Sequence, residues 1–129
     1  MKKIISAAIL AAITLVSCQQ SLEDKCAKEA EDFTRKKCPS RIDEFIMIDS
    51  MTFDKTTHTL SYWYHVTGQA DRAEVFNDPN MKKALVDKMK NSTTMQVYKD
   101  AGYNFRFVYR SEDRKTIYLD TTVGEKDYK

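Results

Sequence analysis

The chain has 129 residues, of which 42% are hydrophobic and 31% charged, enough for a single domain with a modest core. It carries 21 basic side chains against 19 acidic ones, so its formal net charge is only +2. A balanced chain offers no basic surface that could displace counterions from a polynucleotide, and we expect no nucleic-acid partner.

The start of the chain has the organisation of an export signal. A basic start is followed by an apolar run over residues 4–16, and the composition turns polar after Cys18. This run is shorter than the ~20 apolar residues of a membrane-spanning helix, so we expect the segment to be removed. The sequence predicts a signal peptide over residues 1–17, a short tether over 18–22 and a single domain over 23–129.

The segment Leu15-Val16-Ser17-Cys18 resembles the lipobox of bacterial lipoproteins, in which the cysteine receives lipid and the peptide is cut just before it. The resemblance implies lipidation of Cys18, and several acyl chains would anchor the product stably in a membrane. Gln19 stands where an aspartate favours inner-membrane retention, so we expect the outer membrane, with the side open. The alternative is an ordinary signal peptide with a chance cysteine.

The two remaining cysteines, Cys26 and Cys38, form an even pair that an oxidising compartment could join in a disulfide. Helical spacing of Leu22, Cys26, Ala30 and Phe33 predicts a helix over this segment. An unbroken helix would hold the two cysteines about 18 Å apart, too far for a bond. Either the disulfide forms and the helix breaks near Phe33, or the helix continues and the thiols stay free.

The next segments change to the period of a β-strand. Residues 44–53 are rich in Phe, Ile and Met, and residues 59–67 alternate between apolar and polar side chains. The polar residues 54–57 between them suit a turn. We predict a two-stranded hairpin.

A second helix and a second hairpin complete the pattern. Asp78-Pro79 is a helix start, a further short turn ends at Gly102, and two alternating segments, 105–110 and 117–123, follow. The order α-β-β-α-β-β predicts an α+β fold, with an antiparallel four-stranded sheet and helices packed on one face.

Several short motifs in this pattern resemble a widespread group of small exported bacterial proteins of unknown function. They are Cys38-Pro39 before Ile42-Asp43, the strand Leu60-Ser61-Tyr62-Trp63-Tyr64, and the Gly102-led aromatic strand that ends at Tyr109. The resemblance spans most of residues 36–109, and the chain lacks cysteines that many members carry near the second helix and the C-terminus. It supports the domain boundary and implies no activity.

Motifs for catalysis or cofactor binding are missing from the sequence. His58 and His65 lie on opposite faces of a strand-like segment, so they do not converge on a metal. The three glycines form no phosphate-binding loop, and no nucleophile elbow is present. We predict no catalytic residue, no metal site and no cofactor.

The face of the sheet that points away from the helices is the more informative surface. If Tyr62, Tyr64 and their neighbours face the helices, the opposite face presents aromatic and arginine side chains of the kind enriched where partners bind. The alternative is an ordinary solvated sheet face. The predicted partner-binding residues are Trp63, His65, Arg106, Arg110, Tyr118 and Asp120.

Two tripeptides, Asp49-Ser50-Met51 and Asp120-Thr121-Thr122, resemble the O-glycosylation acceptor of Bacteroidota envelope proteins, which would make Ser50 and Thr121 acceptors.

The leading hypothesis is a non-enzymatic, membrane-anchored envelope lipoprotein whose exposed sheet face binds a protein or glycan. One alternative is a small envelope hydrolase that uses His65 with a carboxylate. Another is a structural surface protein without a specific ligand.

Overall fold

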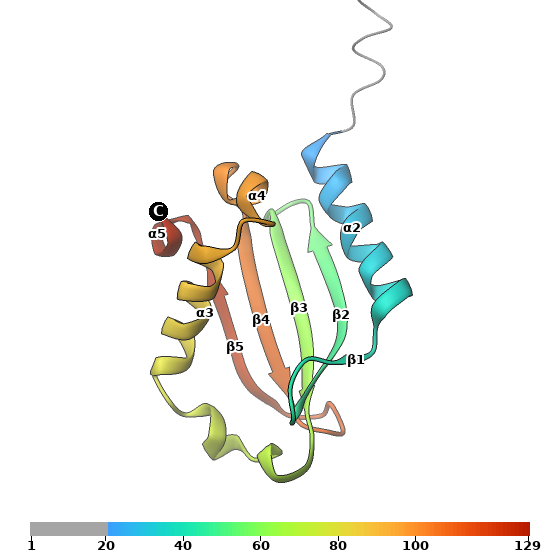
Figure 1. Ribbon diagram of the computed structural model, residues 1–129, viewed down its shortest axis with the longest axis vertical. Helices are drawn as coiled ribbons and strands as arrows, with labels where there is room; N and C mark the ends of the chain where they lie inside the picture. The colour runs from blue at the N-terminus through green and yellow to red at the C-terminus, as the bar shows by residue number, and fades with distance from the viewer. Residues whose placement is uncertain (1–20) are drawn as a thin grey trace, which may run out of the picture.

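A computed structural model describes residues 21–129 of the chain, and Figure 1 shows helices arranged over a twisted sheet. The first described helix, α2, spans Leu22–Lys37. Ser21 begins it by accepting a hydrogen bond from the backbone N–H of Asp24 at 3.1 Å. Acidic residues in its first turn and basic ones in its last complement the helix dipole. Its apolar side packs on the sheet through Cys26 and Ala30.

The continuity of α2 separates the two described cysteines. Cys26 is buried in the middle of the helix, whereas Cys38 follows its last residue, and both thiols are free. Of the two alternatives that the sequence left open, the structure therefore has the unbroken helix and no Cys26–Cys38 bond.

A short strand and a long hairpin follow the helix. Strand β1, Ser40–Arg41, pairs with β2, Ile46–Asp54, which pairs in turn with β3, Thr59–Val66. The carboxylate of Asp54 stabilises the hairpin turn by accepting the backbone N–H of Thr56 at 2.8 Å. The polar turn forms where it was predicted, because the carboxylate of an aspartate at its start can accept hydrogen bonds from the backbone N–H groups of the turn.

A helical connection leads from β3 back across the sheet. Two 3₁₀ turns, Gly68–Ala70 and Ala73–Phe76, come before helix α3, Asn80–Asn91, and helix α4, Gln96–Asp100. Asp78 caps α3, since its carboxylate accepts the backbone N–H of Asn80 at 2.9 Å. The chain then enters strand β4 at the same end of the sheet where β3 began.

Buried Lys99 joins the two helices of this connection. Its ammonium group donates hydrogen bonds to the carbonyl oxygens of Met89 and Lys90 at 2.8 and 3.0 Å. These carbonyls lie at the end of α3, where a cation is favourable for the helix dipole. Gly102, with φ of 78°, then turns the chain out of α4.

The second hairpin consists of β4, Asn104–Arg110, and β5, Ile117–Val123, and the short helix α5, Glu125–Tyr128, follows. Within residues 21–129 the sheet has five strands in the order β1 to β5, and β3 is parallel to β4 while the other neighbours are antiparallel. The fold is α+β, but the predicted antiparallel four-stranded sheet is wrong. A helical crossover returns the chain to the start of β3, which makes the next strand parallel.

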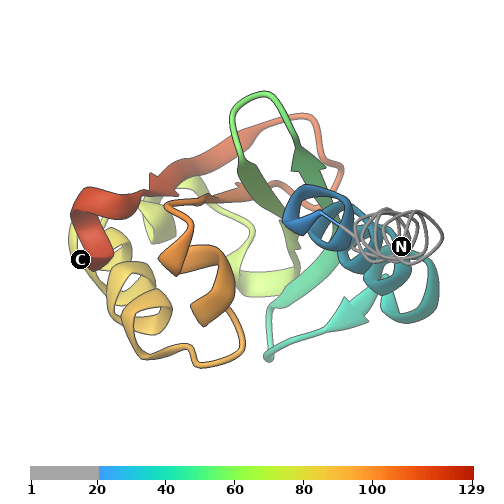
Figure 2. The same cartoon turned by 90° about the horizontal axis from the view of Figure 1, so that it is seen from above.

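The core lies between the sheet and the helices on one face. Figure 2 shows α2 and α3 apart from each other, with α4 beside α3. Within residues 21–129 no helix is long and apolar enough to cross a bilayer. The most completely buried side chains of this core come from both layers: Cys26, Val66, Tyr98, Phe105, Phe107 and Val123. Val108 is equally buried but lies on the other face of the sheet, where it pairs with Trp63.

Candidate functional site

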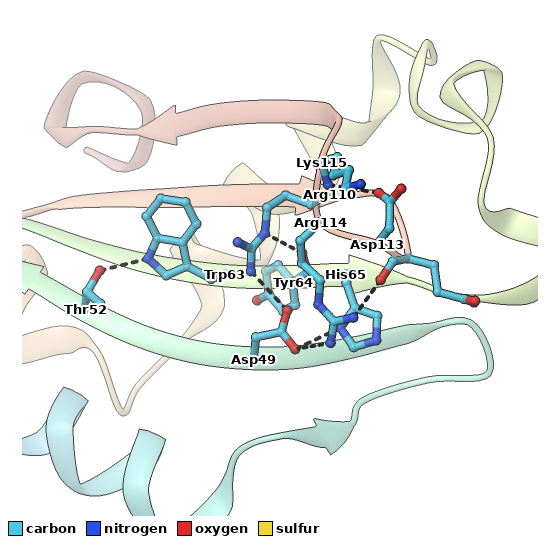
Figure 3. Close-up of polar contacts among 10 residues, drawn as sticks. Asp49, Thr52, Trp63, Tyr64, His65, Arg110, Asp113, Arg114 and Lys115 are labelled. Carbon is cyan, nitrogen blue, oxygen red and sulfur yellow. Dashed lines mark hydrogen bonds and ion pairs between the residues drawn. The ribbon is translucent and has the colours of Figure 1, made fainter.

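Strand β3 supplies side chains to two different surfaces. Because successive residues of a strand point to opposite faces, Tyr62 and Tyr64 face the helices while Trp63 and His65 lie on the open face. Both surfaces contain a hollow, so both are candidate sites. Figure 3 shows the polar contacts on the open face.

Trp63 occupies the centre of the open face. Its indole N–H donates to the hydroxyl of Thr52 at 2.8 Å, which fixes the ring over β2. Val108 of β4 pairs with Trp63, and Arg106 and Arg110 lie two residues before and after Val108 on the same face. Their guanidinium groups lie 5.1 and 5.4 Å from the centre of the Trp63 ring. These are cation–π distances, so the three side chains hold one another in place.

Each of the two arginines is also paired with an acid. Arg106 makes a bidentate contact to Asp120, with N–O distances of 2.9 and 2.7 Å. The hydrogen bonds from this guanidinium hold the pKa of the Asp120 carboxyl below its usual value. Strand alternation predicted Trp63, Arg106 and Asp120 on one face, and the structure brings them together there.

The acid paired with Arg110 is Asp49, a residue that was not predicted on this face. Its carboxylate lies 3.0 Å from Arg110, 3.4 Å from Arg114 and 2.8 Å from Nδ1 of His65 (Figure 3). Asp49 is the extra residue of a β-bulge in β2, since Ile48 pairs with Tyr64 and Ser50 with Trp63. A bulge changes the sheet face to which a side chain points, so that it differs from the face that simple alternation predicts. No local sequence pattern indicated the bulge at Asp49.

Tyr118 does not belong to the open face, and that part of the prediction is wrong. Its ring stacks on Phe76 at 5.6 Å, and its hydroxyl donates to Asp71 at 2.7 Å, which raises the pKa of Tyr118 to about 12. A second bulge causes the change, because Tyr109 pairs with Leu119 and Arg110 with Ile117. Ile117 takes the open-face position instead and is exposed.

Of the two histidine–carboxylate pairs within residues 21–129, His65–Asp49 is the more buried and contains the histidine that the hydrolase alternative invoked. The side chain of His65 is only 8% exposed, and within residues 21–129 no hydroxyl or thiol hydrogen-bonds to its other ring nitrogen. A His–Asp pair without an adjacent nucleophile lacks the contact that activates one. Its visible role is to complete the ion-pair network around Asp49.

The second surface is an apolar groove on the helix side of the sheet, here called the helix-side groove. It encloses about 370 Å³ between α2 and the α3–α4 segment, which Figure 2 shows standing apart. Leu60, Tyr62 and Tyr64 of β3 form its floor. Its walls are formed by Cys26, Glu29, Ala30, Phe33, Ile42, Ile48, Met51, Lys88 and Met95.

The floor of the helix-side groove is rigid and uncharged. Tyr62 stacks on Phe107 at 4.9 Å, and Tyr64 stacks on Tyr109 at 4.6 Å. Burial raises the pKa of the Tyr62 and Tyr64 hydroxyls, so both stay neutral. Neither hydroxyl makes a hydrogen bond within residues 21–129, and neither is sealed from solvent, since both residues line the groove and no fully buried side-chain polar atom there lacks a partner.

Two charged side chains stand on opposite walls of this groove. Glu29 of α2 accepts a hydrogen bond from the hydroxyl of Tyr98 at 2.5 Å, which links α2 to α4. Lys88 of α3 forms no ion pair with any acid of the described part of the chain. The groove therefore combines an apolar floor with one cation whose charge is not matched nearby.

The other predicted site residues lie in different parts of the molecule. Cys18 and the predicted signal peptide, together with most of the tether, lie outside the described residues. Ser50 is half-buried on the open face beside Trp63, and Thr121 is half-buried opposite Phe107, on the helix side of β5. Among residues 21–129 no group of three metal-ligating side chains converges.

Three solved structures share this fold. A protein of Pseudomonas aeruginosa described as secreted matches with a TM-score of 0.66 at 15% identity, over 86% of this chain and 100% of its own. The pilotin EpsS of the Vibrio vulnificus type 2 secretion system matches at 0.64 and 14% identity, over 84% and 92%. The Vibrio cholerae type II secretion pilotin AspS matches at 0.58 and 16%, over 88% and 97%.

The chain belongs to the family described as a domain of unknown function, DUF8479, whose model matches residues 21–119. No curated protein sequence matches it. The match includes the whole of residues 36–109, on which the resemblance to small exported proteins of unknown function was based. At 14–16% identity the solved structures establish a common fold.

Proposed function

We propose that this chain is a non-enzymatic, lipid-anchored protein of the bacterial outer membrane that binds an apolar segment of a partner protein in its helix-side groove. The lipid anchor is Cys18, and the described domain presents the groove to the partner. The charges on the open face are already paired with one another, which makes that face a weaker candidate for a protein partner.

The observation that carries the proposal is the gap between α2 and α3. Helix α2 packs on β2, whereas α3 packs against β5 and α5, so the floor strand between them is left open. Two helices that stand apart over a sheet leave room for an amphipathic helix or an extended segment to pack between them. Apolar walls would supply the affinity, and Lys88 would select an acidic group at the rim of that segment.

The unpartnered hydroxyls in the floor point to the same conclusion. Tyr64 is only 3% exposed, and its hydroxyl makes no hydrogen bond within residues 21–129 but still reaches solvent, since no fully buried side-chain polar atom there lacks a partner. A segment that covers this hydroxyl must supply a hydrogen bond, because burying the group without one would cost free energy. A hydrogen bond to this hydroxyl would therefore fix the orientation of the bound segment, in addition to the apolar contacts.

The shared fold supports a role in the envelope. Two of the similar structures are pilotins of type II secretion systems, which supports a protein partner for a domain of this fold. A protein partner in the envelope is the function that this resemblance favours for our chain.

The anchor is tested by the intact mass and membrane partitioning of the native protein and a Cys18→Ala variant. We expect the native protein to be membrane-bound and to carry acyl mass that the variant lacks. A native protein that is soluble and free of acyl groups would refute the anchor and leave the groove proposal standing.

The groove is tested by photo-crosslinking in intact cells from two exposed isoleucines. Ile42 lines the groove and is 48% exposed, while Ile117 is 56% exposed on the opposite face, so each tolerates a photoreactive residue. We expect position 42 to crosslink one protein through an apolar or amphipathic segment, and position 117 not to crosslink it. Crosslinking of that protein from position 117 alone would contradict the proposal.

A further inference from the structure

The open face has a hollow of its own, separate from the helix-side groove. It encloses about 370 Å³ next to Trp63, and we call it the Trp63 hollow. Where the helix-side groove is lined mostly by apolar side chains, this hollow is bordered largely by hydroxyl groups. The side chains that matter here are Thr52, Asp54, Ser61, Trp63, Arg106 and Thr122.

Ser61 contributes an unused polar group to this hollow. The residue is only 6% exposed and lines the hollow from β3, between the positions of Thr59 and Trp63 on the same face. Its hydroxyl has no hydrogen-bond partner within residues 21–129, and yet it is not sealed from solvent. A hydroxyl can both donate and accept, so it is available to a ligand that does the same.

The charges around the hollow decide which kind of ligand fits. Arg106 is neutralised by its bidentate contact to Asp120, although its third guanidinium nitrogen has no partner within residues 21–129. Asp54 adds a negative charge to the wall. The hollow therefore has no positive excess with which to hold a phosphate, sulfate or uronate.

We propose that the Trp63 hollow binds a neutral saccharide unit, which makes the open face a glycan-binding surface distinct from the helix-side groove. A pyranose carries hydroxyls around its rim and C–H groups on its faces. The hydroxyl of Ser61 and the free N–H groups of Arg106 match the rim, and the indole of Trp63, held between Arg106 and Arg110, forms an apolar wall of the hollow.

Trp63 is the single tryptophan of the chain, so its fluorescence reports on the hollow directly. The experiment titrates the mature protein with the methyl glycosides of glucose, galactose, mannose and N-acetylglucosamine, and separately with glucuronate. We expect a saturable change in Trp63 emission with at least one neutral glycoside. Ser61→Ala should weaken that binding about five- to ten-fold, because it removes one hydrogen-bonding group.

Thr116→Ala is the matched control, since it removes a hydroxyl from the exposed β4–β5 turn, outside the hollow. It should bind as the native protein does. The proposal is overturned if no neutral glycoside changes the emission, if glucuronate binds more tightly than every neutral glycoside, or if Ser61→Ala binds as well as Thr116→Ala. Circular dichroism of the two variants confirms that they share the native fold.

Discussion

The two faces of strand β3 differ in how their polar groups are satisfied. On the open face Arg106 and Arg110 each meet a carboxylate and flank Trp63. On the helix side the groove is apolar, and the charge of Lys88 has no acidic partner within residues 21–129. Alternation along one strand thus builds a surface with paired charges on one side and an open apolar groove on the other.

This difference shows why residue type alone is a poor guide to a binding surface. Tryptophan and arginine are enriched at interfaces, but a pair that is already satisfied gains little from a new partner. An apolar groove and an unpaired cation gain more, because the partner removes apolar area from water and matches the charge. We therefore place the protein partner on the helix side and only a small neutral ligand on the open face.

The largest expected effect comes from removing the ring beside the groove floor, on the neighbouring strand β4. Phe107 is 1% exposed and stacks on Tyr62. Phe107→Ala should lower the free energy of unfolding by about 3–5 kcal/mol, because it leaves a cavity in the core. Urea unfolding followed by circular dichroism measures this, with exposed Ile117→Ala as the control. A loss below about 1 kcal/mol would show that the floor is not packed as described.

The cysteines test the wall of the groove. Burial raises the pKa of the Cys26 thiol to about 11, whereas Cys38 is only half-buried. At pH 8 in a Cys18→Ala chain, we expect iodoacetamide to modify Cys26 at least about 100-fold more slowly than an ordinary free cysteine, because its thiolate is scarce. Cys38 should react faster, and peptide mass spectrometry gives both rates. A Cys26–Cys38 disulfide in the same sample would contradict the unbroken α2.

A smaller loss is expected when the network of the open face is broken at its centre. Asp49→Asn keeps the size of the side chain but removes the charge that His65 and Arg110 share. Because these groups are largely buried, we expect a loss of about 1–3 kcal/mol in urea unfolding. Asp87→Asn, an exposed position on α3, is the matched control and should change little. Equal stability of the two variants would mean that the charges of this face are not paired in solution.

The smallest effect concerns the dependence of stability on pH. The hydrogen bonds from Arg106 lower the pKa of Asp120 in the folded state, so this carboxylate stabilises the fold at pH values above its ordinary pKa of about 4. The contribution is lost as the pH falls through the lowered value. Since both side chains are about one-third exposed, we expect about 0.5–1 kcal/mol at pH 6 between native and Asp120→Asn, shrinking towards pH 2. A difference that grows on acidification would contradict the pairing.

The local elements were predictable because their signals lie within short segments. Alternation marked both hairpins, Asp54 marked the first turn, and Asp78-Pro79 marked the start of α3. The open-face positions of Trp63, Arg106 and Asp120 followed from the same alternation. Each of these features needs only neighbouring residues to be satisfied.

The features that were not predicted depend on contacts between distant segments. The parallel pairing of β3 with β4 follows from where the α3–α4 connection crosses the sheet, which composition does not reveal. The bulges at Asp49 and Tyr118 exchange the faces that simple alternation assigns. The groove could not be predicted either, because it is the space left between α2 and α3 after both have packed.

The most direct test of binding in the helix-side groove compares two matched variants. The crosslinked partner segment is made as a synthetic peptide, and its Kd is measured for each variant. Ile42→Asp places a charge in the helix-side groove, and Ile117→Asp places the same charge on the open face, at similarly exposed positions. We predict that Ile42→Asp raises Kd at least about ten-fold, because a charge in an apolar site is costly, while Ile117→Asp leaves Kd unchanged. The opposite pattern would contradict the assignment of the partner to the groove.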